Sequence, residues 1–145
     1  MKLQKLLLIF IISVAVASSA HSQTYLIPSI GISDKGYFVA GLGFNQQIAG
    51  RIQITTEMID LANVRSGANF GGKIGVTVVK NMDFQVVPAI GYYYHYFSAD
   101  KTEYTKGKNY WSAGIFLKAE GGKWFTEAGL IKNEFTLRTG LKIKL

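Results

Sequence analysis

The C-terminal stretch, residues 135–145, alternates strictly between two kinds of side chain. Its odd-numbered positions are apolar apart from one threonine, and its even-numbered positions include Arg138, Lys142 and Lys144. A period of two is typical of a β-strand, in which successive side chains point to opposite faces. The pattern predicts a strand with one apolar and one charged face, and the stretch ends on the apolar face with Leu145.

Seven earlier segments repeat this alternation. They are residues 25–32, 36–45, 48–58, 70–79, 84–96, 109–119 and 123–131. Tight turns are predicted at 33–36, 45–47, 80–83, 120–122 and 131–134, and longer loops at 59–69 and 97–108. The segments are close to the ~9–11 residues that a tilted strand needs to cross a bilayer. The sequence therefore predicts eight strands in a single domain.

The charges gather on one face of these strands. The predicted polar residues of this face are Arg51, Glu57, Lys73, Lys118, Glu127 and Arg138. Unpaired buried ions cost several kcal/mol each, so such a face does not form a dry apolar core. It suits a polar lumen, with the apolar faces turned outward to lipid. The fold class predicted is all-β, a closed antiparallel eight-stranded up-and-down transmembrane β-barrel.

A lumen of this size leaves little space for an ion path. The interior of an eight-stranded barrel is just wide enough for side chains to fill it. Glu127 and Arg138 fall on adjacent strands and are predicted to pair. We therefore expect a lumen plugged by a hydrogen-bonded polar network.

The first residues differ from the rest of the chain. Lys2 and Lys5 precede an apolar run at 6–17, and small residues follow at 18–20. This order is typical of a secretory signal peptide, and the run is shorter than the ~20 residues of a membrane helix. We predict a signal peptide over 1–22, cleaved after residue 20 or 22, and a barrel over 23–145.

The lengths of the connections and the positions of the aromatic residues are both typical of a membrane barrel. The second, fourth and sixth connections are short, whereas the two longest loops, 59–69 and 97–108, are the third and fifth. Membrane barrels have short turns on the periplasmic side and longer loops outside. Threading the strands in this way also gathers aromatic residues near both ends, which is expected of belts at the two membrane interfaces.

With this pattern of strands and loops, the chain resembles the small OmpA/OmpX-type outer-membrane β-barrels of Gram-negative bacteria. The C-terminal strand is similar to the assembly signal of that family at Arg138, Gly140, Ile143 and Leu145, although the family more often ends on Phe. The resemblance implies a place in the cell outer membrane, contact with outer-membrane lipid and lipopolysaccharide, and insertion by the barrel-assembly machinery.

The expected role is structural or surface-interacting, with loops 59–69 and 97–108 available to a protein partner. One alternative is a lipid-modifying enzyme with His95 near the outer rim, beside Ser98 or Asp100. Two further functions fit the same strand pattern, a small channel and a soluble lipocalin-like ligand-binding barrel.

No enzymatic activity, catalytic residue, cofactor or metal is expected, because the chain offers no spacing typical of such sites. The basic residues are spread over many segments, and an exported protein rarely meets nucleic acid, so no nucleic-acid partner is expected either.

Overall fold

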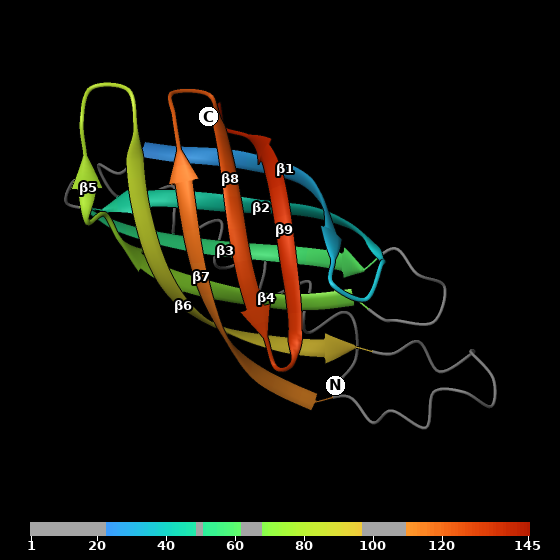
Figure 1. Ribbon diagram of the computed structural model, residues 1–145. Coiled ribbons are helices and arrows are strands. Elements are labelled where there is room, and N and C mark those ends of the chain that lie inside the picture. Colours follow the sequence, from blue (N-terminus) through green and yellow to red (C-terminus); the bar gives the residue numbers. More distant parts are fainter. Residues whose placement is uncertain (1–22, 49–50, 62–67, 97–109) are drawn as a thin grey trace, which may run out of the picture.

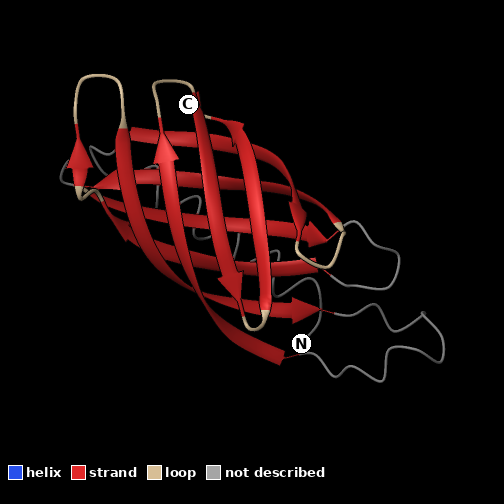
Figure 2. Ribbon diagram, in the orientation of Figure 1, coloured by secondary structure: helices blue, strands red, loops and turns tan. Residues whose placement is uncertain are grey.

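The computed structural model describes residues 23–48, 51–61, 68–96 and 110–145, which form one antiparallel sheet closed into a barrel (Figures 1 and 2). The strands are β1 (Gln23–Ser33), β2 (Phe38–Ile48), β3 (Ile52–Leu61), β4 (Ala68–Val76), β5 (Val79–Lys80), β6 (Gln85–Tyr96), β7 (Tyr110–Glu120), β8 (Trp124–Ile131), β9 (Glu134–Leu141) and β10 (Ile143–Lys144). Within these ranges, no helix has the length and hydropathy to cross a membrane.

The ten segments occupy eight positions around the barrel. β4 and β5 both pair with β6, and β9 and β10 both pair with β1, so each of these pairs continues a single position. All other neighbours in the sheet are consecutive in sequence. Ser29 pairs with Gly140 and Leu26 with Ile143, which closes the last strand against the first. The fold class and the strand count predicted from the sequence are confirmed.

The interruption between β9 and β10 has a local cause in Pro28. The register on either side of the gap is continuous, and it places Pro28 opposite Leu141. Proline has no N–H to donate to a ladder. On the other side of the strand, the Lys142 N–H donates to the Lys123 carbonyl at 2.9 Å, so the last strand stays joined to β8 where its ladder with β1 is interrupted.

The two faces of the barrel differ as the alternation predicts. Large apolar side chains are exposed on the outer face of most strands, including Ile30, Leu42, Ile74, Ile90, Ile115 and Leu137. The buried side chains of the inner face are largely polar, including Ser29, Asn45, Gln53, Glu57, Lys73, Lys118, Glu120, Glu127 and Arg138. A soluble β-domain shows the opposite arrangement, with apolar residues inside and polar residues outside.

Several strand ends differ from the prediction. Asn45 and Glu120 were expected in turns, but they lie within β2 and β7 with side chains buried in the lumen. Polar residues are typical of turns in soluble proteins, whereas in this fold they are also typical of the inner face. The loop predicted over 59–69 is likewise shorter, because β3 runs to Leu61 and β4 starts at Ala68.

The remaining connections lie at the two opposite ends of the barrel. The β5–β6 and β7–β8 turns lie at the same end as the C terminus, which we call the turn end (Figure 1). The connection predicted over 131–134 is shorter in the structure and consists of Lys132 and Asn133. It lies at the opposite end of the barrel, which we call the loop end, and Lys132 adopts a positive φ of 56°. The predicted signal peptide, residues 1–22, and the predicted loop 97–108 lie outside the described residues.

Candidate functional site

Four charged side chains meet in the middle of the lumen, and we call them the central cluster: Glu57, Lys73, Glu127 and Arg138. Lys73 Nζ lies 2.9 Å from Glu57 Oε1 and 2.6 Å from Glu127 Oε1. Arg138 Nη2 lies 3.1 Å from Glu57 Oε2 and 2.5 Å from Glu127 Oε1. None of the four side chains is more than 4% exposed. Two carboxylates thus balance two cations, which offsets the cost of removing them from water.

An aromatic layer borders the central cluster. The Tyr93 hydroxyl donates to Glu57 Oε1 at 2.6 Å, and its ring lies 5.5 Å from that of Phe116. Lys73 Nζ lies 4.6 Å from the centre of the Phe116 ring, a distance typical of a cation–π contact. Tyr93 was absent from the predicted network. Tyr93 lies an even number of positions from inward-facing Val87 and His95, and this spacing could have placed it in the lumen.

A second charged group lies toward the turn end and is centred on Glu120. Gln53 Nε2 donates to Glu120 Oε1 at 2.6 Å, and Lys118 and Lys142 lie 3.1 and 3.4 Å from Glu120 Oε2. Lys118 also donates to Gln53 Oε1 at 2.6 Å. Glu120 was missed by the sequence analysis because two glycines follow it. Its spacing of two from Lys118 on the same strand marks it as inward-facing.

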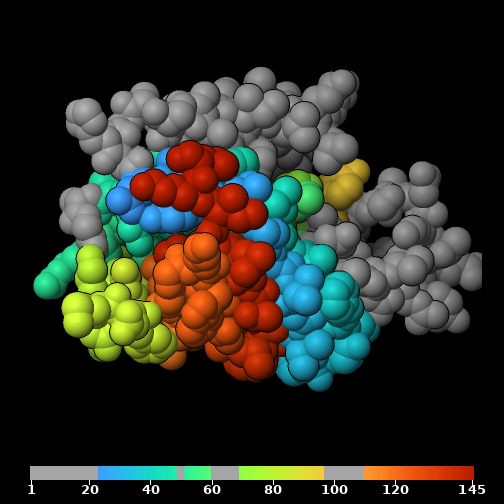
Figure 3. Space-filling model, turned by 90° about the horizontal axis from the view of Figure 1, so that it is seen from above, coloured from blue at the N-terminus to red at the C-terminus, as the bar shows by residue number. Residues whose placement is uncertain are grey.

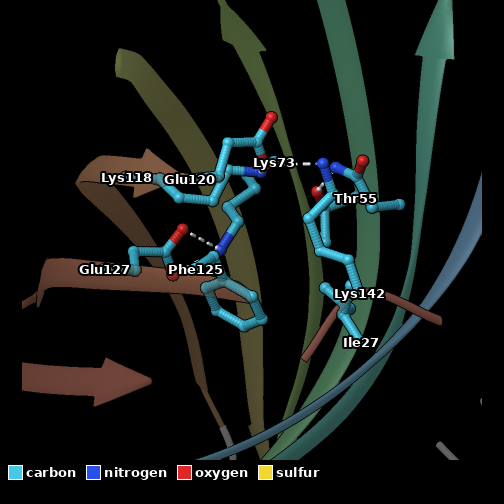
Figure 4. Close-up of a pocket in the computed structure, with 9 residues that line it drawn as sticks. Ile27, Thr55, Lys73, Lys118, Glu120, Phe125, Glu127 and Lys142 are labelled. Atoms are coloured by element: carbon cyan, nitrogen blue, oxygen red, sulfur yellow. Dashed lines mark hydrogen bonds and ion pairs between the residues drawn. The ribbon is translucent and has the colours of Figure 1, made fainter. Parts of the chain in front are cut away.

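A small cavity of about 10 Å³ separates the two charged groups. Around it converge Lys73 from β4, Lys118 and Glu120 from β7, Glu127 from β8, and Lys142 from between β9 and β10 (Figure 4). The site is polar, and its volume is about that of one ordered water molecule. Asn45 Oδ1, which also borders the cavity, has no hydrogen-bond donor within the described part of the chain.

His95 faces the lumen at the loop end. Its Nδ1 atom is hydrogen-bonded to Asn69 Oδ1, and its ring stacks on Tyr110 with centroids 5.0 Å apart. A recess of about 30 Å³ adjoins these side chains. Ser98 and Asp100, the partners considered for an enzymatic site, lie outside the described residues.

Arg51 does not belong to the lumen network, and this part of the prediction is wrong. Arg51 is exposed and lies in the β2–β3 turn, one residue before the strand begins. Arg51 lies two residues before inward-facing Gln53, which in a strand would place both side chains on the same face. This spacing orients a side chain only while the backbone is extended. The structure buries the other five predicted residues, Glu57, Lys73, Lys118, Glu127 and Arg138, in the lumen.

The four residues of the predicted assembly signal lie in three environments. Arg138 belongs to the central cluster. Gly140 lies on the inner face, where an added Cβ would meet the Phe125 ring at 2.8 Å. Ile143 and Leu145 face outward at the turn end, 45% and 67% exposed. Only the last two are therefore presented on the outside of the barrel.

Outward aromatic residues lie toward both ends. Near the loop end, Tyr92 and Trp111 stack with ring centroids 5.0 Å apart, and both are at least half exposed. Trp124 lies near the turn end and is 46% exposed. Aromatic residues with apolar rings and polar edges are favoured where lipid meets water. The apolar outer surface is thus bordered by aromatic residues at both ends.

The chain was compared with known proteins. No protein-family model matches the sequence, and no curated protein matches it. The fold is similar to the N-terminal β-barrel domain of OprF from Pseudomonas aeruginosa, with a TM-score of 0.62 and 10% identity over 85% of this chain and 97% of that chain. A de novo designed barrel, TMB2.3, gives a TM-score of 0.60 and 13% identity over 86% of this chain and 94% of that chain. A second de novo designed transmembrane β-barrel gives a TM-score of 0.59 and 12% identity over 85% of this chain and 95% of that chain.

These likenesses concern the fold, since the identities are low. Together with the apolar outer surface and the charged lumen, they define the class of this protein: a closed eight-stranded antiparallel β-barrel with the fold of known transmembrane β-barrels.

Proposed function

We propose that the protein is an integral outer-membrane β-barrel with a structural or surface-interaction role, and that its lumen is closed by side chains. The observation that carries this proposal is the distribution of charge. The outer face is apolar along its strands, whereas the charged side chains inside neutralise one another in the central cluster. An apolar exterior is stable only in lipid, and a lumen filled by ion pairs is no path for ions.

The ion pairs support a closed lumen because they join opposite walls. Lys73 on β4 contacts Glu127 on β8, and Arg138 on β9 contacts Glu57 on β3. Neither pair of strands is adjacent in the sheet. The contacts therefore cross the bore, and an ion passing through would have to separate buried charges at a cost of about 3–5 kcal/mol for each broken pair.

Export and insertion complete the proposal. Residues 1–22 direct the chain out of the cytoplasm, and the barrel-assembly machinery recognises the last strand at Arg138, Gly140, Ile143 and Leu145. Once inserted, the outer surface contacts lipid, and the loop end meets lipopolysaccharide. The loops between β3 and β4 and between β6 and β7 provide the surface for a protein partner.

The proposal includes no enzymatic role. His95, the strongest candidate for a catalytic base, is held by Asn69 and stacked on Tyr110. Within the described residues, the two spaces inside the lumen measure about 10 and 30 Å³, far below the roughly 300–1,000 Å³ of a ligand pocket. The larger recess of about 250 Å³ at the turn end has a polar lining that includes Glu120 and Lys142, which does not suit the apolar ligand of a lipocalin-like barrel.

Cell fractionation combined with gel migration tests the proposal. We expect recovery in the outer membrane, extraction only with detergent, and a band that shifts when the sample is boiled. Planar-bilayer recordings should show no steady conductance. Recovery from the periplasm without detergent would support the soluble barrel, and stable conductance would support the channel. A changed lipid A profile on expression, lost in His95→Ala, would support the enzyme.

A further inference from the structure

The outer face carries an apolar groove at the seam where the last strand meets the first. Its walls are Pro28, Ile30, Trp124 and Leu141, and its volume is about 400 Å³. Thr139 and the backbone at Ser29 and Gly140 also line it. Figure 3 shows the red C-terminal strand against blue β1 and the orange strands before it, the strands that form the seam.

The groove exists because small residues interrupt a surface of large ones. Thr139 and Thr126 face outward as register partners on β9 and β8. Thr126 Oγ1 donates to Thr139 Oγ1 at 3.3 Å, and Thr139 Oγ1 donates to the Phe125 carbonyl at 2.9 Å. Because both hydroxyl hydrogens are used within the sheet, Thr139, the threonine that lines the groove, leaves no hydroxyl hydrogen free for a ligand. The groove therefore suits a hydrocarbon chain.

Positive charge surrounds the turn end of the barrel. Among the residues that the structure describes, Arg51, Lys80, Lys123 and Lys144 are exposed there, against the single exposed acid Asp83. None of these four cations forms an ion pair within the described ranges. The loop end differs, because Lys35 and Glu134 are paired there at 3.8 Å. The turn end thus has unneutralised cations beside the apolar surface.

Two of these cations lie on the rim close to the turn-end edge of the groove, without lining it. Lys123 directly precedes Trp124, and its carbonyl accepts the bond that joins β8 to Lys142. Lys144 lies three residues beyond Leu141 in the last strand of the barrel, which corresponds to about 10 Å of extended backbone. Both lysines share the spacing of the lumen-facing residues of their strands, but they are exposed at the rim. There a flexible four-carbon stem can turn outward and bring the ammonium group to a phosphate at the mouth of the groove, while the apolar walls hold the chain below it.

We propose that this groove binds one anionic phospholipid, with an acyl chain against Thr139 and Pro28 and its phosphate beside Lys123 and Lys144. The inference rests on the proposed function, since membrane barrels place their short turns on the periplasmic side, where the leaflet consists of phospholipid. A basic surface next to a bilayer attracts anionic headgroups, and each lysine is worth about fivefold in affinity.

Native mass spectrometry tests the proposal with the detergent-solubilised barrel and an equal mixture of dioleoyl-phosphatidylglycerol and dioleoyl-phosphatidylethanolamine. We expect one retained lipid and a preference of at least about fivefold for phosphatidylglycerol. The K123Q/K144Q variant should lose this preference. The matched pair R51Q/K80Q, which removes two cations of the same rim away from the groove, should keep it.

A second pair of variants tests the groove itself. Thr139→Phe fills it without a change of charge, so retention of both lipids should fall. Thr56→Phe, at an outward threonine on β3, should leave retention unchanged. Equal retention of both lipids by the wild type, equal losses in the two lysine variants, or no effect of Thr139→Phe would overturn the proposal. A dimer peak that disappears in Thr139→Phe would assign the groove to a second copy and also overturn it.

The outcome is separable from that of the proposed function. Each variant is first checked for heat-modifiable migration and recovery in the outer membrane. A barrel that inserts but shows no lipid preference contradicts only this proposal, whereas a chain that never reaches the membrane contradicts the proposed function.

Discussion

The Glu127 carboxylate and the Arg138 guanidinium are register partners on β8 and β9, with Oε1 and Nη2 2.5 Å apart. The same Nη2 atom reaches Glu57 on β3, at 3.1 Å. One guanidinium therefore joins a pair of neighbouring strands to the far wall of the barrel. Because the Arg138 side chain is only 2% exposed, these contacts form with little competition from water.

Replacing Glu127 by Gln should strongly destabilise the barrel. The change leaves Lys73 and Arg138 with a single carboxylate between them, and breaking a buried ion pair costs about 3–5 kcal/mol. Urea unfolding from lipid vesicles, followed by tryptophan fluorescence, measures the loss. Glu134→Gln is the control, because its contact with half-exposed Lys35 is worth less than about 1 kcal/mol. Equal effects of the two variants would show that the central cluster contributes no special stability.

Replacing Tyr93 by Phe should destabilise the barrel by about 1.5–3 kcal/mol, the usual value of a hydrogen bond to a charged group. The ring and its packing on Phe116 are kept, and only the 2.6 Å bond to Glu57 is lost. The same unfolding measurement applies. Tyr92→Phe makes the same chemical change at an outward, exposed neighbour and should alter stability by less than about 0.5 kcal/mol. If Tyr92→Phe proved the more damaging change, the hydrogen bond to Glu57 would be unimportant.

Replacing Gly140 by Ala should loosen the closing seam. The new Cβ would meet the Phe125 ring at 2.8 Å and the Pro28 carbonyl, an overpacking worth roughly 1–3 kcal/mol. Gly122→Ala is a matched control, since an added Cβ there meets nothing within 4 Å. A fall in the unfolding midpoint for Gly140→Ala alone would give this glycine a packing role in the finished barrel. If both variants unfold like the wild type, any defect of Gly140→Ala belongs to assembly.

The architecture could be predicted because the alternation of apolar and polar side chains along each strand determines it. A period of two assigns every strand residue to one face, and the scarcity of charge on one of those faces predicts lipid as its solvent. The strand count and the closing of the last strand on β1 follow from this pattern. The pairing of Glu127 with Arg138 also follows from it, because both residues face inward on neighbouring strands.

The strand ends and the contacts across the bore could not be predicted in this way. Parity placed Arg51 in the lumen, but the backbone turns before the strand starts at Ile52. Glu120 was assigned to a turn by its following glycines, although it is 1% exposed inside the barrel. The contact between Lys73 and Glu127 depends on barrel diameter and stagger, which alternation along one strand does not encode.

Replacing both Ile143 and Leu145 by Asp should prevent insertion. Both residues face outward at the turn end, where an acidic side chain costs only about 0–1 kcal/mol in the finished barrel. The expected loss therefore reports recognition of the last strand during assembly. The Ile48→Asp, Ile52→Asp variant places the same two charges at the same end of the barrel on β2 and β3, and it should still insert. Membrane-fraction yields that are alike for the two double variants would show that the last strand carries no assembly signal.

Replacing Ile115 by Lys decides which solvent the outer face meets. Ile115 lies at the middle of β7 and is 60% exposed, so in a lipid-facing strand the new charge lies near the bilayer midplane. The expected cost is about 2–4 kcal/mol. On a soluble barrel the same exposed position would tolerate lysine within about 0.5 kcal/mol. Met82→Lys, at a fully exposed turn residue, should be neutral in either case and serves as the control. Urea unfolding of the three proteins in lipid vesicles gives the comparison, and an Ile115→Lys barrel as stable as the control would place its outer face in water.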